Sequence, residues 1–247
     1  MKISKQATCL TPIISIYGEE GTGKTTLAVK FPKPLALLYE VGVPRGMSID
    51  AVQDVGNFDA SMTVLSEIYK DPQGYQSLVI DTLDVFEPMV IAATCAEHGW
   101  KSIEQPPYGR GYIEAATKWR RFIAAITAIR NKHDMAIVMT CHAHIERIDD
   151  PRVPSYTSYQ MRLHRRARAL IMDACDAVFF LGDDLRVITE SGGFNDRTRG
   201  TSDNKRYLFS ERRPAFAAKN RFGMPPKIPV GVDFDISELS KYWNGAP

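Results

Sequence analysis

A glycine-rich segment of eight residues constrains this chain more than any other feature. It reads Gly18-Glu19-Glu20-Gly21-Thr22-Gly23-Lys24-Thr25, is followed by Thr26, and comes directly after an apolar run at residues 12–17. The spacing Gly-x4-Gly-Lys-Thr lets backbone N–H groups turn inward around a phosphate, where the lysine reaches terminal oxygens and the threonine hydroxyl binds Mg²⁺. A helix beginning near Gly23 would add its partial positive charge. Residues 18–26 are therefore predicted to bind a nucleoside triphosphate.

The length and composition fit a soluble protein with a full hydrophobic core. The chain has 247 residues, of which 44% are hydrophobic, and a net charge of +2, so no global polyanion-binding signature exists. We expect one domain, with a core at about residues 12–182 and a β extension and tail at about 183–247. The four cysteines are far apart, and no membrane-length apolar run or signal-peptide core is present. These features predict a cytoplasmic protein with reduced thiols and no membrane contact.

Apolar runs of strand length alternate with helical patterns, which predicts an α/β fold with a mostly parallel central sheet flanked by helices. The expected strands are residues 13–17, 35–40, 78–81, 136–140 and 177–181, and the expected helices are 24–30, 60–69, 83–97 and 112–131. One face of the last helix carries Ile113, Ala116, Trp119, Phe122, Ile123, Ile126 and Ile129. After residue 181 we expect hairpin strands at 185–189, 207–213 and 215–218, a loop at 191–196 and a short helix at 236–243.

Two carboxylates follow expected strands at the edge where parallel sheets bind ligands. Asp81 ends the run 78–81, and next to a phosphate loop it suits a metal ligand beside Thr25. Asp84 competes for this role, and we interpret it as a helix-start residue. Glu40 ends the run 35–40 and would activate water if its strand neighbours the first one; otherwise it is an exposed strand-end acid.

Polar residues also follow the fourth expected strand. The sequence there is Thr140-Cys141-His142-Ala143-His144, and His142 is our candidate for sensing or polarising the terminal phosphate. A His-x-His pair without nearby cysteine or acid in metal-site spacing is poor support for a metal site.

A basic stretch with aromatic residues comes next. Residues 145–168 contain six arginines against three acids, a local balance of +3. Arginine and tyrosine in a mobile loop suit single-stranded nucleic acid, but a solvated loop leading into a helix has the same composition. A second candidate loop spans residues 103–112. The candidate DNA-binding residues are Arg110, Arg147, Arg152, Tyr156, Tyr159, Arg162 and Arg165.

The segment Lys219-Asn220-Arg221 places two cations around an asparagine. It is either a plain surface turn or a clamp in which Lys219 and Arg221 reach the triphosphate of a neighbouring subunit. The second interpretation requires a homo-oligomer with nucleotide at its subunit interfaces.

In this order, the elements resemble the RecA-like ATPase core over residues 13–226, and within it the phage-encoded atypical RecA-type single-strand annealing recombinases. Glu40 matches the water-activating glutamate, Asp81-Thr82 the metal site, and Lys219-Asn220-Arg221 the Lys-Asn-Lys inserted into the adjacent ATP site. Cys141-His142 stands where RecA has Asn-Gln. The segment after Asp81 resembles the first DNA loop and residues 145–162 the second. No N-terminal polymerisation helix is recognisable.

The resemblance implies an ATPase that hydrolyses ATP with Mg²⁺, binds single-stranded DNA and promotes annealing or strand exchange as an oligomer in phage recombination. Three alternatives stay open on the sequence alone. They are a replicative helicase-like motor or loader, a small-molecule kinase with residues 145–168 as its lid, and a nucleotide-gated binding module with negligible turnover.

Overall fold

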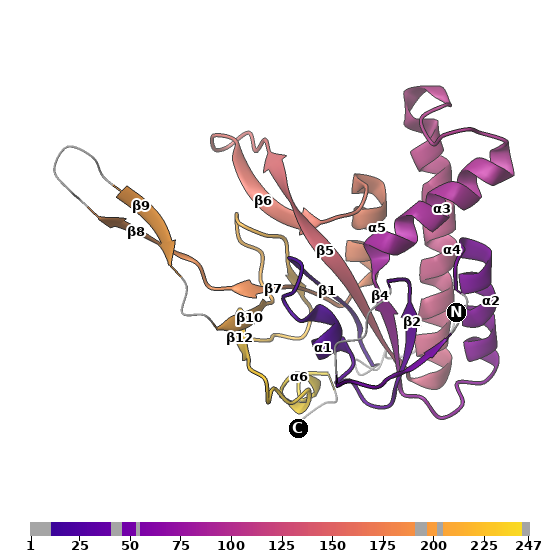
Figure 1. Ribbon diagram of the computed structural model, residues 1–247, viewed down its shortest axis with the longest axis horizontal. Coiled ribbons are helices and arrows are strands. Elements are labelled where there is room, and N and C mark those ends of the chain that lie inside the picture. The colour runs from indigo at the N-terminus through magenta and orange to yellow at the C-terminus, as the bar shows by residue number, and fades with distance from the viewer. Residues whose placement is uncertain (1–10, 41–45, 53–54, 191–196, 202–204, 244–247) are drawn as a thin grey trace, which may run out of the picture.

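The computed structural model describes residues 11–40, 46–52, 55–190, 197–201 and 205–243, with the backbone alone for 186–190 and 197–201 (Figure 1). The loop predicted at residues 191–196, Cys9 and the extreme N-terminus lie outside these ranges. None of the helices in the described ranges combines the length and apolar character needed to cross a lipid bilayer.

A ten-stranded mixed sheet forms the centre, in the order β12-β10-β7-β1-β5-β4-β2-β3, with β11 on β7 and β6 on β5. Strands β7, β1, β5, β4, β2 and β3 run parallel, whereas β10, β12, β11 and β6 are antiparallel to their partners. The strands are β1 (Ile13–Gly18), β2 (Pro34–Leu38), β3 (Asp50–Val52), β4 (Ser77–Asp81), β5 (Ala136–Ile148), β6 (Tyr156–Met161), β7 (Ala177–Asp183), β10 (Arg206–Phe209), β11 (Lys219–Asn220) and β12 (Lys227–Val230). A separate pair, β8 (Arg186–Glu190) and β9 (Arg197–Thr201), extends away from the sheet (Figure 1).

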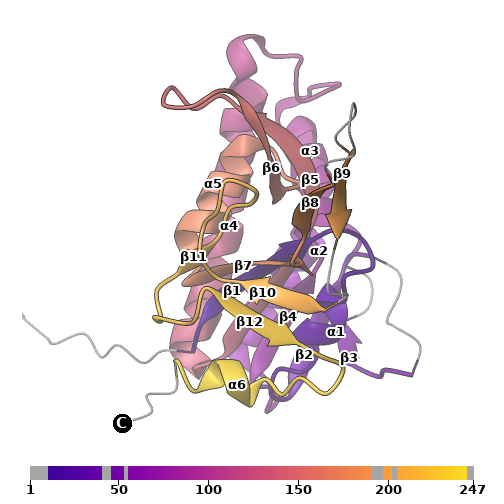
Figure 2. The ribbon, with the colours of Figure 1, turned by 90° about the vertical axis from the view of Figure 1, so that its left-hand side faces the viewer.

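Helices cover both faces of the sheet. They are α1 (Lys24–Ala28), α2 (Phe58–Lys70), α3 (Leu83–His98), α4 (Arg110–His133), α5 (Arg165–Ala174) and α6 (Ser237–Ser240), with a 3₁₀ turn at Pro107–Gly109. Helices α2 to α5 pack on the face that carries Tyr17 and Ile80, while α1 and α6 pack on the face that carries Ile16 and Val79 (Figures 1 and 2). The expected α/β fold with a mostly parallel, helix-flanked sheet is therefore confirmed.

The continuous apolar runs are explained by burial on both faces. Every residue of β1 and β4 is buried, because side chains that alternate between the two faces meet a helical layer on either side. The five core strands expected from the sequence all form, with end points shifted by at most two residues except in β5.

Strand β5 is the largest departure from the sequence interpretation. It does not end at Thr140 but continues through His142 to Ile148, and residues 143–148 pair with β6 in an antiparallel hairpin (Figure 1). The prediction of a mobile loop at residues 145–168 was therefore wrong for most of that stretch. The reason is its alternating pattern: Glu146 and Ile148 are half-buried whereas Ile145 and Arg147 are exposed, which is the periodicity of a strand.

Three further expectations need correction. The loop predicted at residues 103–112 contains the 3₁₀ turn and the start of α4, so Arg110 and Tyr112 are helical. Ile113 was placed on the buried face of this helix, but this residue is 46% exposed because it lies about two and a half turns before Phe122 and therefore on the opposite side of the helix. The strand expected at residues 215–218 does not form; only Phe216 makes isolated bridges there, to Tyr159 and Arg213.

The two sides of α4 generate a stability prediction. Phe122 is fully buried in the core, whereas Ile113 on the same helix is half-exposed. Phe122→Ala should lower the free energy of unfolding by about 3 to 5 kcal/mol because it leaves a cavity. Ile113→Ala should change it by less than about 1 kcal/mol. Urea unfolding of both variants tests this, and equal losses would contradict the described packing of α4.

Candidate nucleotide-binding site

The glycine-rich segment connects the buried end of β1 to α1. Gly18 closes β1, and a Cβ atom there would lie 2.2 Å from the carbonyl oxygen of Leu181. Gly23 has φ +90°, a conformation suited to glycine, and a Cβ atom there would lie 2.4 Å from the guanidinium of Arg206. The tight loop therefore depends on glycine at both positions.

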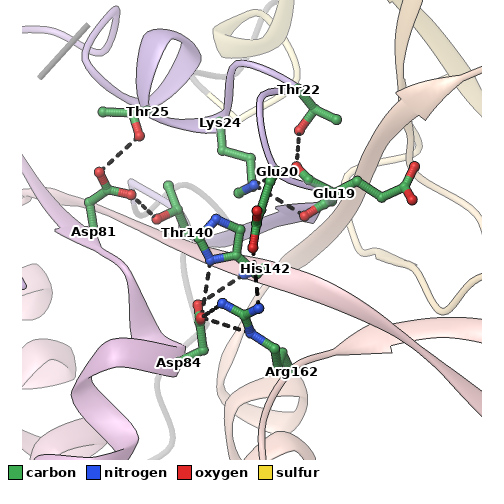
Figure 3. A network of polar contacts seen from close by, with 11 residues as sticks. Glu19, Glu20, Thr22, Lys24, Thr25, Asp81, Asp84, Thr140, His142 and Arg162 are labelled. Atoms are coloured by element: carbon green, nitrogen blue, oxygen red, sulfur yellow. Dashed lines mark hydrogen bonds and ion pairs between the residues drawn. The ribbon is translucent and has the colours of Figure 1, made fainter. Parts of the chain in front are cut away.

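Lys24 lies across the mouth of this loop. Its Nζ donates hydrogen bonds to the carbonyl oxygens of Gly18 at 3.1 Å and Glu19 at 2.7 Å (Figure 3). Burial lowers the pKa of Lys24, and nearby carboxylates, Asp84 first among them, oppose that shift. The ammonium group is therefore held inside the curve of the loop, where a phosphate would be bound.

The hydroxyl of Thr25 and the carboxylate of Asp81 meet at the carboxyl end of β4. Thr25 Oγ1 donates to Asp81 Oδ2 at 2.8 Å, and Thr140 Oγ1 on β5 donates to the other oxygen of the same carboxylate (Figure 3). Asp81 is buried, so these two hydroxyls satisfy its carboxylate. The phosphate loop thereby reaches over β5 to β4.

These residues fit Mg²⁺. Thr25 and Asp81 offer two adjacent oxygen atoms, the donor type that this cation prefers, and Mg²⁺ characteristically takes its other ligands from phosphate and water. Bound there, the cation would neutralise charge on the terminal phosphates. His142 and His144 do not share a metal-ligand set with other residues in the described part of the chain.

A second carboxylate, Asp84 in the first turn of α3, is the centre of a denser network. Its side chain is only 3% exposed. Asp84 Oδ1 accepts the backbone N–H of His142 at 3.0 Å, and Oδ2 lies 3.0 Å from His142 Nδ1. Arg162, which follows β6, donates to Asp84 Oδ2 from Nη2 at 2.7 Å and from Nε at 3.1 Å (Figure 3). Burial alone would raise the pKa of Asp84, but hydrogen bonds from the His142 amide and Arg162 hold it well below its usual range.

The strand β6 contacts the phosphate loop directly. Arg162 Nη1 lies 3.4 Å from Glu20 Oε1, and the Tyr159 hydroxyl donates to Glu19 Oε1 at 3.4 Å. Both glutamates are exposed positions of the glycine-rich segment. Two residues proposed from the sequence as DNA contacts, Tyr159 and Arg162, therefore lie beside the nucleotide site.

Glu40 reaches the same edge from farther away. Its strand β2 does not neighbour β1, because β5 and β4 lie between them, so the condition attached to this prediction was wrong. Strands β1 and β2 are therefore three strand spacings, or roughly 14 Å, apart. Burial lowers the pKa of Lys24, and Glu40 is the last of the carboxylates that oppose this shift, since the loop itself leans over β5 toward β4. Its water-activating role stays a prediction.

The other candidate DNA residues lie along the β5–β6 hairpin and its surroundings. Arg147 pairs with Asp149 at 3.0 Å, and Arg152 makes a two-pronged pair with Asp150. Tyr156 is half-buried at the start of β6. Arg165 is exposed at the start of α5, whereas Arg110 lies on α4 and pairs with Glu114 at 3.7 Å. Arg110 is thus separate from the hairpin group.

Lys219 and Arg221 lie at the opposite edge of the sheet from the phosphate loop. Lys219 pairs in register with Val178 near the start of β7, and its Nζ donates to the last carbonyls of α5, with 2.7 Å to Met172 O. Arg221 lies 3.6 Å from Asp176, whose carboxylate accepts the N–H of Ile13 at the start of β1. The length of β1, roughly 16 Å, separates them from their own chain's nucleotide site.

Three residues of the site were missed or undervalued in the sequence interpretation. Arg206 Nη1 donates to the Thr22 carbonyl at 2.9 Å, because β10 runs antiparallel to β7 and brings Arg206 opposite Asp183 at the carboxyl edge. Thr140 was treated only as a strand residue, and Asp84 only as a helix start. The Thr140-Cys141-His142 run was a usable signal for Thr140, whereas no spacing indicates Arg206.

Removing the Asp81 charge should impair metal-assisted turnover. Asp81→Asn should reduce ATP hydrolysis by about a hundredfold and shift the Mg²⁺ dependence to higher concentration, because a ligand beside Thr25 is lost. Asp59→Asn, which removes an exposed carboxylate on α2, is the matched control. Steady-state rates across a Mg²⁺ titration test this; an unaltered Mg²⁺ dependence in a folded Asp81→Asn protein would exclude the metal role.

The Asp84 network predicts a pH-dependent contribution to stability. Because its folded-state pKa is depressed, ionised Asp84 stabilises the fold above its unfolded pKa, about 3.9, and this contribution fades as the pH falls further. Asp84→Asn should lower the free energy of unfolding at pH 7 by about 1 to 3 kcal/mol. Urea unfolding between pH 7 and pH 2 should show the difference from the wild type shrinking below about pH 4. A constant difference over that range would rule out this role.

Comparison with known proteins agrees with this geometry. The family model AAA_24, described as an AAA domain, matches residues 11–222, which include the glycine-rich segment, Asp81 and Asp84. The SPbeta prophage-derived uncharacterized protein YorG of Bacillus subtilis (strain 168) is 22% identical over 221 residues. That match covers 84% of this chain and 64% of the relative, so the chain spans less than two thirds of the relative's length. The family match extends over most of the chain, and the chain therefore belongs to the AAA domain family of P-loop proteins, a membership that indicates a nucleotide-binding ATPase.

Proposed function

We propose that this protein is a Mg²⁺-dependent ATPase of RecA-like type that binds single-stranded DNA on its β5–β6 hairpin and promotes annealing or strand exchange. The observation that carries the proposal is the contact between hairpin and phosphate loop. Arg162, at the end of the hairpin, forms ion pairs both with Asp84 at the start of α3 and with Glu20 in the phosphate loop. A triphosphate entering the loop brings negative charge next to this guanidinium.

The arrangement supports coupling between nucleotide and DNA in both directions. A terminal phosphate competes with Glu20 for Arg162, since the Glu20 contact is long and solvent-exposed. Movement of Arg162 is passed to β6, whose first residue, Tyr156, pairs with Ile148 at the far end of the hairpin. The basic residues Arg147 and Arg152 lie in that outer part. Nucleotide binding would then change the free energy of DNA binding on the hairpin, and DNA binding would change that of nucleotide binding equally.

An oligomeric assembly belongs to the same proposal. Because Lys219 and Arg221 lie at the sheet edge opposite their own phosphate loop, they can contact a triphosphate only across an interface between subunits. Their present partners are the end of α5 and Asp176, so the clamp would require these contacts to exchange. The prophage origin stated for the relative is compatible with a role in phage recombination.

The experiment is ATP hydrolysis with and without a single-stranded oligonucleotide at two salt concentrations. We expect stimulation that weakens at the higher salt, because cation–phosphate contacts release counterions. Arg147→Ala should reduce the stimulation and lower the slope of its dependence on the logarithm of salt concentration by about one. Replacing Arg120, an exposed arginine on α4, by alanine should change neither. Unwinding of a forked duplex would favour the helicase or loader alternative.

The same assay can reject the proposal. Without stimulation or binding of any oligonucleotide, a small-molecule kinase becomes the better hypothesis, and residues 145–168 would serve as its lid. Binding of DNA without any turnover would favour the nucleotide-gated binding module.

A further inference from the structure

A basic cavity lies between the tip of the β5–β6 hairpin and the segment that follows β10. Its volume is about 460 Å³. The two walls come from distant parts of the chain, which are joined where Tyr159 N donates to Ala215 O at 2.8 Å. The lining residues are Asp150, Arg152, Val153, Tyr156, Arg212, Arg213 and Pro214.

The charge in this cavity is unevenly compensated. Asp150 is fully engaged by Arg152, which donates to it from the backbone N–H at 3.0 Å and from the guanidinium at 3.0 and 2.8 Å. On the opposite wall, Arg212 and Arg213 are exposed, and Arg212 lies near enough to Asp150 to help lower the pKa of that carboxyl after Arg152, its main partner. The guanidinium of Arg213 lies 5.4 Å from the centre of the Phe209 ring, which fixes its direction. Three arginines against one aspartate leave the cavity with a net positive charge that an anion can neutralise.

The hairpin wall offers apolar and aromatic surface beside these charges. Val153 is 51% exposed, and Tyr156 is a half-buried lining residue of the cavity. A cavity of this size is within the range that binds small organic ligands. Guanidinium groups suit phosphate oxygens, and a tyrosine ring suits the face of a base. One nucleotide unit combines these two chemistries at the right scale.

We propose that this cavity binds one nucleotide unit of single-stranded nucleic acid, with its phosphate on Arg212 and Arg213 and its base against Tyr156. The inference rests on the proposed function and extends it, because it assigns part of the nucleic-acid path to a segment outside the hairpin. An acidic protein segment would pair with the two arginines but would not stack on Tyr156. Nucleic acid is therefore the better-matched partner.

The test measures binding of a fluorescently labelled single-stranded oligonucleotide by anisotropy across a salt titration. Arg212→Ala should weaken binding about three- to tenfold and reduce the salt slope by about one. Its basal ATP hydrolysis should be unchanged, since Arg212 is not part of the phosphate site. Arg120→Ala on α4 is the matched control and should bind as the wild type does. Arg212→Lys should restore part of the affinity.

A second variant separates base from phosphate contacts. Tyr156→Leu should weaken binding of the normal oligonucleotide about fivefold or more, but not binding of an abasic oligonucleotide of equal charge. Equal losses on both would overturn the assignment of the base to Tyr156.

The outcomes distinguish this inference from the proposed function. If the wild type binds DNA and Arg212→Ala binds it with the same affinity and salt slope, the inference is overturned and the proposed function is not. Failure of the wild type to bind any oligonucleotide would overturn both. Binding of polyglutamate, but not of DNA, in an Arg212-dependent manner would identify the cavity as a protein-docking site and reject the nucleic-acid assignment.

Discussion

The buried carboxylate of Asp84 is the interaction on which the arrangement of this site depends. A carboxylate with 3% exposure is stable only when its oxygens are fully hydrogen-bonded or paired. Here the donors come from His142 on β5 and from Arg162 after β6. Satisfying Asp84 therefore requires β5 to continue past the sheet edge and β6 to return to it. The hairpin is in this sense anchored by a charge inside the nucleotide site.

The two carboxylates at this edge have different surroundings and therefore different uses. Asp81 is held by two neutral hydroxyls and forms no ion pair of its own, although the Lys24 ammonium lies near it, so its oxygens are available to a cation. Asp84 is held by a guanidinium and by the backbone and ring of His142, so its charge is already matched. Their positions on consecutive elements, the end of β4 and the start of α3, place the carboxylate that we propose as a metal ligand beside a structural one. This division of roles follows from their partners, not from the residue type.

Much of the fold was predictable because it depends on local pattern. The apolar runs identified five core strands, and the glycine spacing identified the loop and the position of Lys24. The Asp81 prediction succeeded in placement because parallel strands bring their carboxyl ends to one edge. The end of β5 was misjudged because Cys141-His142 looks like the polar end of a strand. In the structure the strand continues past it, and Asp84 accepts the backbone N–H of His142. Contacts such as Arg162 with Asp84 and Arg206 with Thr22 join residues 78 and 184 positions apart, and no sequence period encodes such pairs.

Arg162 joins the nucleotide site to the β5–β6 hairpin through its pairs with Asp84 and Glu20. Amide hydrogen exchange, with and without Mg²⁺ and a non-hydrolysable ATP analogue, measures whether nucleotide binding reaches the hairpin through this contact. We expect altered exchange in the loop at residues 18–25 and also in residues 156–162, with the second change lost in Arg162→Ala. An analogue that binds and protects the loop while leaving residues 156–162 unchanged would contradict it.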